Sequence, residues 1–553
     1  MLKRVSLTVM DGILFGIYLL HLLSLLWADN FGEAIFATQK YLLLAVLFLA
    51  FRLVLQEDKS VRNQLFPILL ACTGLVSAIV VYQVLQQMGS DGLAGKGVYQ
   101  IVGHAGHKNL TASYLFLLIT FLLYWFNDYR QKPWYWLALS FAFVLMLVLR
   151  SRAVFLAVAL GGLLFGFYLM FANETRKAIL YKRVLPIGVI ALIGLVSLTQ
   201  FTDLGKEYAG FFNPMNYMDS ASGTERLFVW SKTVDLIKER PMSGYGAGNW
   251  KLFFPSKSIE GGYRLMEKDL IFTRVHNDFL EVAAEVGIIG GVLYLSIFVL
   301  ALWACIVNYR KTKPRYRYRW VLLSTAVIGF AIISFFDFPK ERIEHLTLLA
   351  LLLAFIFYDR KSNAAKAAKG ENTMIRYGVV GLCTLFLIIN IPVGYYRFVG
   401  DQASKVILSH RKTNELDIIT GQVQKADSDW YNVDPMVIPL SWYEGVAHYV
   451  LGDYVAAEAP FAQAYEINPF NFNVLNNYAS TVVQLEKYEL AVDLYRQALR
   501  INPRFEEGMF NLSFALYQLG QYDEALEWVQ KTSGNPEKKR LFLQRIEAAL
   551  NTQ

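Results

Sequence analysis

The stretch "TRVHNDFLEVAAEVGIIGG", residues 273–291, passes directly from a cluster of polar residues into an apolar helix. The polar part contains Arg274, His276, Asn277 and Asp278. Asp278 and Glu281 have the spacing of a capping box, so we expect a helix to begin here. Ionisable groups are costly beside a membrane-spanning helix, and they mark sites of function where they occur. Interpreting this cluster therefore depends on the topology of the whole chain.

The composition indicates a membrane protein. The chain has 553 residues, of which 55% are hydrophobic, and its mean hydropathy is +0.34. Its apolar residues come in runs of about 20, the length that crosses roughly 30 Å of hydrocarbon. The first run has no small-residue cleavage pattern, so we expect it to be a retained span. The expected spans are 12–28, 40–56, 64–85, 108–126, 133–149, 153–171, 181–199, 285–308, 320–336, 343–358 and 375–396.

The distribution of charge predicts how these spans are oriented. With a cytoplasmic N-terminus, the connections on the cytoplasmic side are basic, as in "NDYRQK" and "NYRKTKPRYRYR". The net charge of +8 is then a topology signal facing anionic lipid, and it does not indicate nucleic-acid binding. This topology places the long connection and the C-terminal tail on the extracytoplasmic side.

The predicted fold class is all-α: a polytopic transmembrane helix bundle followed by a soluble helical-repeat domain. Residues 1–199 are expected to hold transmembrane helices one to seven, and 285–396 helices eight to eleven. Residues 200–284 form a large extracytoplasmic loop in this scheme. The three cysteines lie singly in apolar runs, which predicts neither a disulfide framework nor a metal site.

Residues 397–553 contain a repeat. "LGDY" at Leu451, "LEKY" at Leu485 and "LGQY" at Leu519 recur every 34 residues, a period typical of tetratricopeptide repeats. Stacked repeats of this kind form a curved surface that binds peptides or partner proteins. A rigid spacer or a self-association module is the alternative interpretation. The expected repeats are 439–470, 471–504 and 505–535.

Five polar clusters fall on the predicted outer side. Besides the opening stretch they are "GHAGHKN" (103–109), "LRSRAVFLA" (149–157), "SGTERLFVWSKTVDLIKERPMSGYGAGNW" (222–250) and "FFDFPKERIEH" (335–345). Each has a structural alternative. Histidines can be interfacial, arginines can snorkel to lipid phosphates, and the glycine-rich segment can be only a turn. Their shared side favours a functional site.

The residue types in these clusters suit an anionic ligand. Arginine offers a planar fork for phosphate oxygens, and histidine can act as a base near neutral pH. A helix N-terminus beside His276 would also favour an anion. An apolar bundle with a phosphate-binding mouth fits a lipid diphosphate, whose tail lies in the bilayer and whose headgroup lies outside.

Five motifs carry a resemblance to a known family. They are "GHKN" (106–109), "SRA" (151–153), "ER…W" (225–230), "G.G.GN" (244–249) and, most specifically, "HNDFLEVAAEVGIIG" (276–290). Over residues 10–400 the chain resembles the O-antigen ligase/polymerase superfamily of bacterial envelope glycosyltransferases. The resemblance implies a glycosyltransferase-C type bundle of eleven or twelve spans in the bacterial inner (plasma) membrane. It implies metal-independent, inverting transfer of a glycan from an undecaprenyl-diphosphate carrier to an acceptor hydroxyl, without a cofactor.

The resemblance also implies roles for individual residues. His276 matches the histidine proposed to activate the acceptor, and Arg152 and Arg226 match arginines that hold the diphosphate. Arg150 and Arg274 are further candidates for the diphosphate. The other candidate site residues are His107, Lys108, Asn277 and His345.

The acceptor stays open at this point. A lipid-linked saccharide would make the protein a ligase, a second repeat unit a polymerase, and a protein hydroxyl an O-oligosaccharyltransferase. A non-enzymatic transporter of lipid-linked glycans, or an envelope scaffold, is the alternative from a different class. Relatives usually have twelve spans and a cytoplasmic C-terminus, so an extra span near 200–215 or 250–256 would place the repeats inside.

Overall fold

The computed structural model describes residues 7–57, 59–90, 100–171, 221–262, 271–358, 373–410, 415–534 and 536–551. These residues form helices and no β-strand, which confirms the all-α prediction for the part of the chain that is described. The expected span at 181–199 lies outside the described residues.

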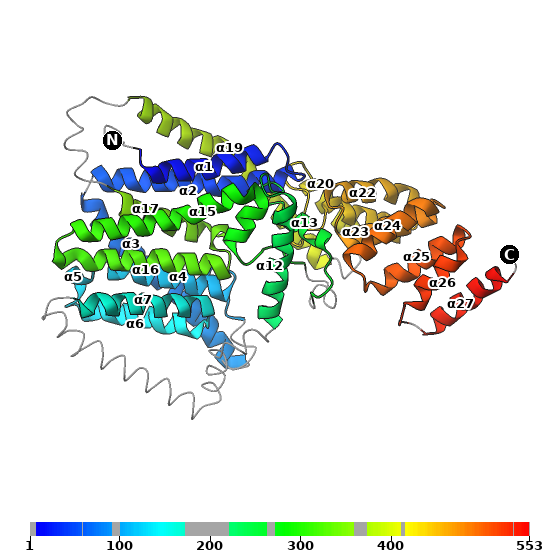
Figure 1. Ribbon diagram of the computed structural model, residues 1–553, viewed down its shortest axis with the longest axis horizontal. Helices are drawn as coiled ribbons and strands as arrows, with labels where there is room; N and C mark the ends of the chain where they lie inside the picture. The colour runs from blue at the N-terminus through cyan, green and yellow to red at the C-terminus, as the bar shows by residue number, and fades with distance from the viewer. Residues whose placement is uncertain are drawn as a thin grey trace.

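The apolar helices pack side by side in one bundle (Figure 1). They are α1 (Val9–Ser24), α2 (Phe31–Glu57), α3 (Lys59–Ser90), α4 (Lys108–Leu123), α6 (Pro133–Val148), α7 (Arg152–Met170), α15 (Asp278–Lys311), α16 (Arg317–Phe336), α17 (Ile343–Phe357) and α19 (Thr373–His410), with the short α5 (Phe126–Tyr129) between α4 and α6. In the described ranges, six helices are long and apolar enough to cross a membrane. Four more apolar helices, α1, α4, α6 and α17, are shorter. Each of the other ten predicted spans overlaps one of these ten helices.

Small and hydroxyl-bearing residues allow these helices to approach closely. Gly161 of α7 faces Thr325 of α16, and Gly329 of α16 faces Phe116 of α4, with no room for a Cβ at either glycine. Thr325 donates its hydroxyl hydrogen to the carbonyl of Val321 in its own helix, so its polar group stays satisfied within the apolar bundle.

One end of the bundle is covered by α12 (Ala221–Glu239), α13 (Trp250–Phe253) and the 3₁₀ turn η3 (Phe254–Lys257). The sequence predicts an amphipathic helix here with Phe228, Trp230, Val234 and Ile237 on its apolar face. Phe228, Trp230 and Ile237 pack against a buried cluster that includes Val229 and Leu236. Val234, in contrast, is 36% exposed and does not belong to this packed face.

The C-terminal region is a stack of antiparallel helix pairs. Three pairs follow the predicted repeats: α21 (Leu440–Val450) with α22 (Tyr454–Ile467), α23 (Phe472–Gln484) with α24 (Tyr488–Ile501), and α25 (Glu506–Gln518) with α26 (Tyr522–Gln530). The helices α20 (Leu416–Ala426) and α27 (Pro536–Leu550) flank them. Gly445 allows α21 and α22 to approach closely, because a Cβ there would lie 2.7 Å from the ring of Phe461.

The repeat domain packs on the end of the bundle that α12 and α13 cover (Figure 1). The N–H of Ile259 donates to the carbonyl of Ile501 at 2.8 Å. The rings of Phe253 and Phe470 are 5.5 Å apart. The described part of the long connection and the repeats therefore lie at the same end of the molecule.

Candidate functional site

His276 lies immediately before α15, at the end of the bundle that faces the repeats. Its φ is 56°, in the left-handed region that residues other than glycine rarely occupy. Asn277 is the N-cap of α15, and its side chain accepts the N–H of Leu280 at 3.1 Å. The N-cap is therefore Asn277 and not Asp278, and the expected capping box of Asp278 and Glu281 does not form. Glu281 instead accepts the N–H of Val275 at 2.9 Å.

A buried carboxylate faces His276. The Nδ1 atom of His276 lies 3.7 Å from Oδ1 of Asp337, the residue that ends α16. The side chain of Asp337 is 2% exposed, whereas that of His276 is 26% exposed. The ring of Phe338 packs edge-on against His276, with 4.9 Å between ring centroids. A carboxylate beside one ring nitrogen orients the imidazole and favours a proton on that nitrogen.

Positive charges from other segments surround this pair. Burial raises the pKa of Asp337, but the neighbouring imidazole of His276 and the charges of His107 and Arg226 outweigh burial and hold that pKa at about 2. Burial lowers the pKa of His107, and Asp337 partly opposes this shift. The charges of His276, Arg226 and Lys108 lower the pKa of His107 further. At neutral pH the site therefore holds an anionic Asp337 and a neutral His107 under the field of Arg226 and Lys108.

These residues come from segments that are distant in the sequence. His107 is the N-cap of α4 and Lys108 its first residue, while Arg226 lies in the first half of α12. The ring centroids of His107 and Phe338 are 6.1 Å apart, which places the start of α4 beside the end of α16. The structure thus brings His107, Lys108 and Arg226 of the predicted set to His276.

The two remaining arginine candidates of "LRSRAVFLA" stand at the start of α7. Arg150 is 5% exposed and has a φ of 49°, so it shares the left-handed backbone of His276. Arg152 is the first residue of α7 and is partly buried.

Two candidates interact with residues other than His276 and Asp337. Arg274 lies 2.7 Å from Glu341 and 3.6 Å from Glu281, and although burial lowers its pKa, these carboxylates raise it above its usual range. Its charge is thus already compensated. His345 is fully buried within the bundle, where its Nε2 lies 2.8 Å from the hydroxyl of Ser113. It has no exposure at a site rim.

The glycine-rich segment "GYGAGNW" packs tightly against neighbouring segments and has a structural role. Gly244, Gly246 and Gly248 all have positive φ angles, and a Cβ at any of them would collide with a neighbouring segment. The N–H groups of Tyr245 and Gly246 donate to the carbonyls of Ala284 and Glu285 at 3.0 and 2.8 Å. These two N–H groups are thus already hydrogen-bonded to α15, and the segment forms a structural turn.

Sequence reasoning gave the acidic residues at this end no role in the site, and it assigned Glu281 only to helix capping. Asp337, Glu281 and Glu341 lie in stretches that were singled out for their histidines and arginines. The available signal was the mixed acidic and basic composition of "FFDFPKERIEH" at a predicted span end.

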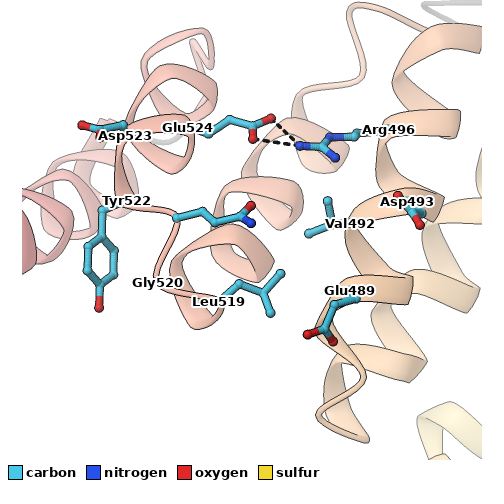
Figure 2. Close-up of a pocket in the computed structure, with 10 residues that line it drawn as sticks. Glu489, Val492, Asp493, Arg496, Leu519, Gly520, Tyr522, Asp523 and Glu524 are labelled. Atoms are coloured by element: carbon cyan, nitrogen blue, oxygen red, sulfur yellow. Dashed lines mark hydrogen bonds and ion pairs between the residues drawn. The ribbon is translucent and has the colours of Figure 1, made fainter.

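A separate pocket of about 510 Å³ lies between α24 and the turn from α25 to α26 (Figure 2). Its charged lining residue Arg496 is paired with Glu524 at 2.8 Å, which lowers the pKa of that carboxylate. The pocket belongs to the repeats and contains none of the predicted site residues. Among the described residues, no group of three or more His, Cys, Asp or Glu side chains is arranged to hold a metal ion.

Comparisons with known families match both parts of the chain. Residues 136–295 match the family described as O-antigen ligase, and residues 482–535 match the family described as tetratricopeptide repeat. The first segment includes Arg150, Arg152, Arg226 and His276.

Curated relatives match each part separately. A Rickettsia conorii protein, provisionally named a polysaccharide ligase, is 25% identical over 177 residues, covering 29% of this chain and 40% of its own length. The small glutamine-rich tetratricopeptide repeat-containing protein 2 of Mycosarcoma maydis is 35% identical over 79 residues, covering 14% of this chain and 22% of its own length. The matches thus span less than half the length of either relative.

A solved structure of the first tetratricopeptide region of Spaghetti, bound to an HSP90 peptide, is similar to part of the chain. It is 20% identical and covers 20% of this chain and 91% of that one, with a TM-score of 0.20.

Proposed function

We propose that this chain, which joins an O-antigen ligase domain to tetratricopeptide repeats, transfers a glycan from undecaprenyl diphosphate to an acceptor hydroxyl. One observation carries the proposal: His276, Asp337, His107 and Arg226 come from four segments and meet at one end of an apolar bundle. A lipid tail fits beside such a bundle, and a diphosphate suits the cationic end.

In the proposed reaction His276 is the general base. It takes the proton of the acceptor hydroxyl, whose oxygen attacks the anomeric carbon of the donor glycan. The bond from that carbon to the diphosphate oxygen breaks, undecaprenyl diphosphate leaves, and attack from the opposite side inverts the anomeric centre. Asp337, 3.7 Å from Nδ1, orients the ring and stabilises the imidazolium that forms.

Cationic side chains take the charge of the leaving group. Arg226 acts on the same buried carboxylate as His276, and Arg226 and Lys108 both act on His107. This proximity to the base supports a role for both cations in binding the diphosphate. Arg152, at the start of α7, is proposed to join them. Preorganised charges of this kind stabilise developing negative charge without reorganising water. In this proposal they replace a metal ion, so chelators would leave activity unchanged.

The repeat domain bears on the acceptor. A lipid-linked saccharide acceptor, which makes the protein a ligase, is the first reading. A protein acceptor is the second, and it is favoured by the contact of Ile259 with Ile501, which holds the repeats against the segment that carries α12. A protein bound on the repeats would then lie at the same end as His276.

The test is transfer by the purified full chain in nanodiscs, with an undecaprenyl-diphosphate glycan as donor. Three acceptors are compared: a lipid-linked core saccharide, a second donor molecule and a candidate acceptor protein. We expect product with one of them, and loss of that product in His276→Ala and Arg226→Ala. His448→Ala and Arg500→Ala, which lie in the repeats, are the matched controls. Full activity of folded His276→Ala would refute the mechanism, and donor binding without any product would favour a transporter or scaffold.

A further inference from the structure

A single carboxylate, that of Glu281, joins the two segments that carry His276 and Asp337. Its Oε2 atom accepts the backbone N–H of Val275 at 2.9 Å, and its Oε1 atom accepts the ammonium of Lys340 at 2.8 Å. Val275 directly precedes His276, and Lys340 follows Asp337 by three residues. The first turn of α15 therefore links the two sides of the candidate site through one side chain.

Lys340 is held on several sides. Its backbone N–H donates to Asp278 at 3.2 Å, and its ammonium also donates to Glu341 at 2.9 Å. Burial lowers the pKa of Lys340, but Glu281 and Glu341 outweigh burial and raise it well above its usual range. Lys340 thus stays charged inside the protein. Arg274 closes the cluster by pairing with Glu341 at 2.7 Å.

The backbone of His276 depends on such anchoring. A histidine at a φ of 56° is in a sparsely populated conformation, which persists only where the surrounding structure determines it. Val275 supplies part of that constraint, because it is fully buried and its carbonyl accepts the indole N–H of Trp230 at 3.0 Å. Its own N–H is held by Glu281, so both backbone polar groups of the residue before His276 are fixed.

We propose that Glu281 and Lys340 are positioning residues that hold His276 in its left-handed conformation opposite Asp337. This inference rests on the proposed function, in which His276 is the base. Neither residue needs to touch the substrate, because both act through the geometry of His276. A misplacement of about 1 Å in a catalytic group costs on the order of 100-fold in rate.

The test compares Glu281→Gln, Lys340→Met and the double variant as purified full chains. We expect each single change to lower kcat about 100-fold while the KM for the donor changes by less than about threefold, because donor contacts stay in place. The double variant should be no worse than about threefold below either single one, because both changes break the same link. Lys340→Arg keeps the charge and should restore kcat to within about tenfold of the unaltered protein.

The matched control is Arg52→Met. Arg52 is fully buried and pairs with Asp11 at 2.5 Å, in a contact between α1 and α2 that involves no residue of the candidate site. This change should lower the melting temperature by about as much as Lys340→Met does but leave kcat within about threefold of the unaltered protein.

The outcomes separate this inference from the proposed function. Suppose that His276→Ala is inactive but that the kcat of Lys340→Met falls no further than that of Arg52→Met. This result would overturn the positioning role alone. An active His276→Ala would overturn the proposed function itself. If Lys340→Met does not fold, Glu281→Gln decides, since it keeps the shape of the side chain and an oxygen for the N–H of Val275. A Glu281→Gln protein with unchanged kcat would overturn the positioning role.

Discussion

At the scale of single residues, Asp337 is the group whose removal tests the site most directly. Asp337→Asn keeps the size of the side chain but replaces a buried anion with an amide that can donate toward His276. We expect kcat to fall by about 100-fold to 10,000-fold, because the imidazole loses its orienting charge and can adopt the wrong tautomer. Asp235→Asn on the exposed face of α12 is the control. A kcat within about threefold of the unaltered protein would contradict the role of Asp337.

The sequence could identify residues whose chemistry is visible without knowledge of their neighbours. The motifs led to His276, His107 and Arg226, and the structure brings these to one place. The partners could not be predicted, because pairing depends on how distant segments pack. Asp337 lies 61 positions after His276, and nothing in either stretch identifies the other. Arg274 is the opposite case. Its motif predicted phosphate binding, but in the structure its guanidinium pairs with the carboxylate of Glu341.

A second residue gives a dependence of stability on pH. Asp427 ends α20, and burial, followed by the charges of Glu444 and Asp429, raises its pKa to about 6 from 3.8. Because the folded pKa lies above the unfolded one, the ionised carboxyl destabilises the folded state. This penalty is fully present above about pH 6 and disappears as the pH falls through 3.8.

We therefore expect Asp427→Asn to stabilise the protein by about 1–2 kcal/mol at pH 8, after allowance for partial exposure of the side chain. The gain should vanish at pH 3.5. Asp417→Asn at the start of the same helix is the control, and it should be slightly destabilising because a negative charge is favourable at a helix N-terminus. Melting temperatures of the three proteins at the two pH values check this. An equal shift at both pH values would contradict it.

At the scale of elements, α15 is interrupted where sequence periodicity predicts a continuous span. Val286 and Gly287 have non-helical backbone angles, and Gly287 has a φ of 81°. The N–H groups of Tyr245 and Gly246 donate to the carbonyls of Ala284 and Glu285, just before the break. The N–H of Ile288, just after it, donates to the carbonyl of Pro241 at 2.8 Å. The apolar pattern predicts the helix, but only the packing of this remote segment explains its interruption.

Gly287→Ala tests this arrangement. The added Cβ would lie 2.1 Å from the carbonyl oxygen of Met242, in a backbone conformation that alanine disfavours. We expect a loss of about 2–4 kcal/mol of stability, measured as a lower melting temperature in detergent. The matched control is Gly162→Ala in α7, where nothing lies within 4 Å of the new Cβ, so stability should be unchanged or slightly higher. Equal melting temperatures for the two variants would contradict the close packing of Gly287 against the glycine-rich segment.

At the scale of the whole molecule, the fold was largely predictable because its two parts have periodic signals. Apolar runs identify the bundle helices, and the recurrence of "LGDY" and "LGQY" identifies the repeats. The relative placement of the two parts carries no such signal. It depends on contacts such as the 2.7 Å hydrogen bond from Asn30 to Asn432, which links the start of α2 to the entry of the repeats.

The orientation in the membrane follows from this placement and from charge. The helix α15 runs from the site at Asp278 to Lys311, where Arg310, Lys311, Arg315 and Arg317 gather at the opposite end. The positive-inside bias assigns that basic end to the cytoplasm, so the site and the repeats should both face outward. This orientation needs an odd number of membrane crossings in the chain between α7 and α12, as the single predicted span at 181–199 provides. An even number would leave the site and the end of α7 on the same side of the membrane.

Cysteine labelling of intact cells tests the orientation. In a background where Cys72, Cys305 and Cys383 are serine, single cysteines are introduced at Asp235 and Ser533 on the site end and at Arg315 on the basic end. We expect an impermeant maleimide to label the first two in intact cells and the third only after permeabilisation. Because Ile259 and Ile501 hold the repeats against the loop, the first two positions must respond together. Labelling of Arg315→Cys alone would show that the topology is the reverse of the predicted one. His276 would then lie on the side of the membrane opposite to the one on which we propose that transfer takes place.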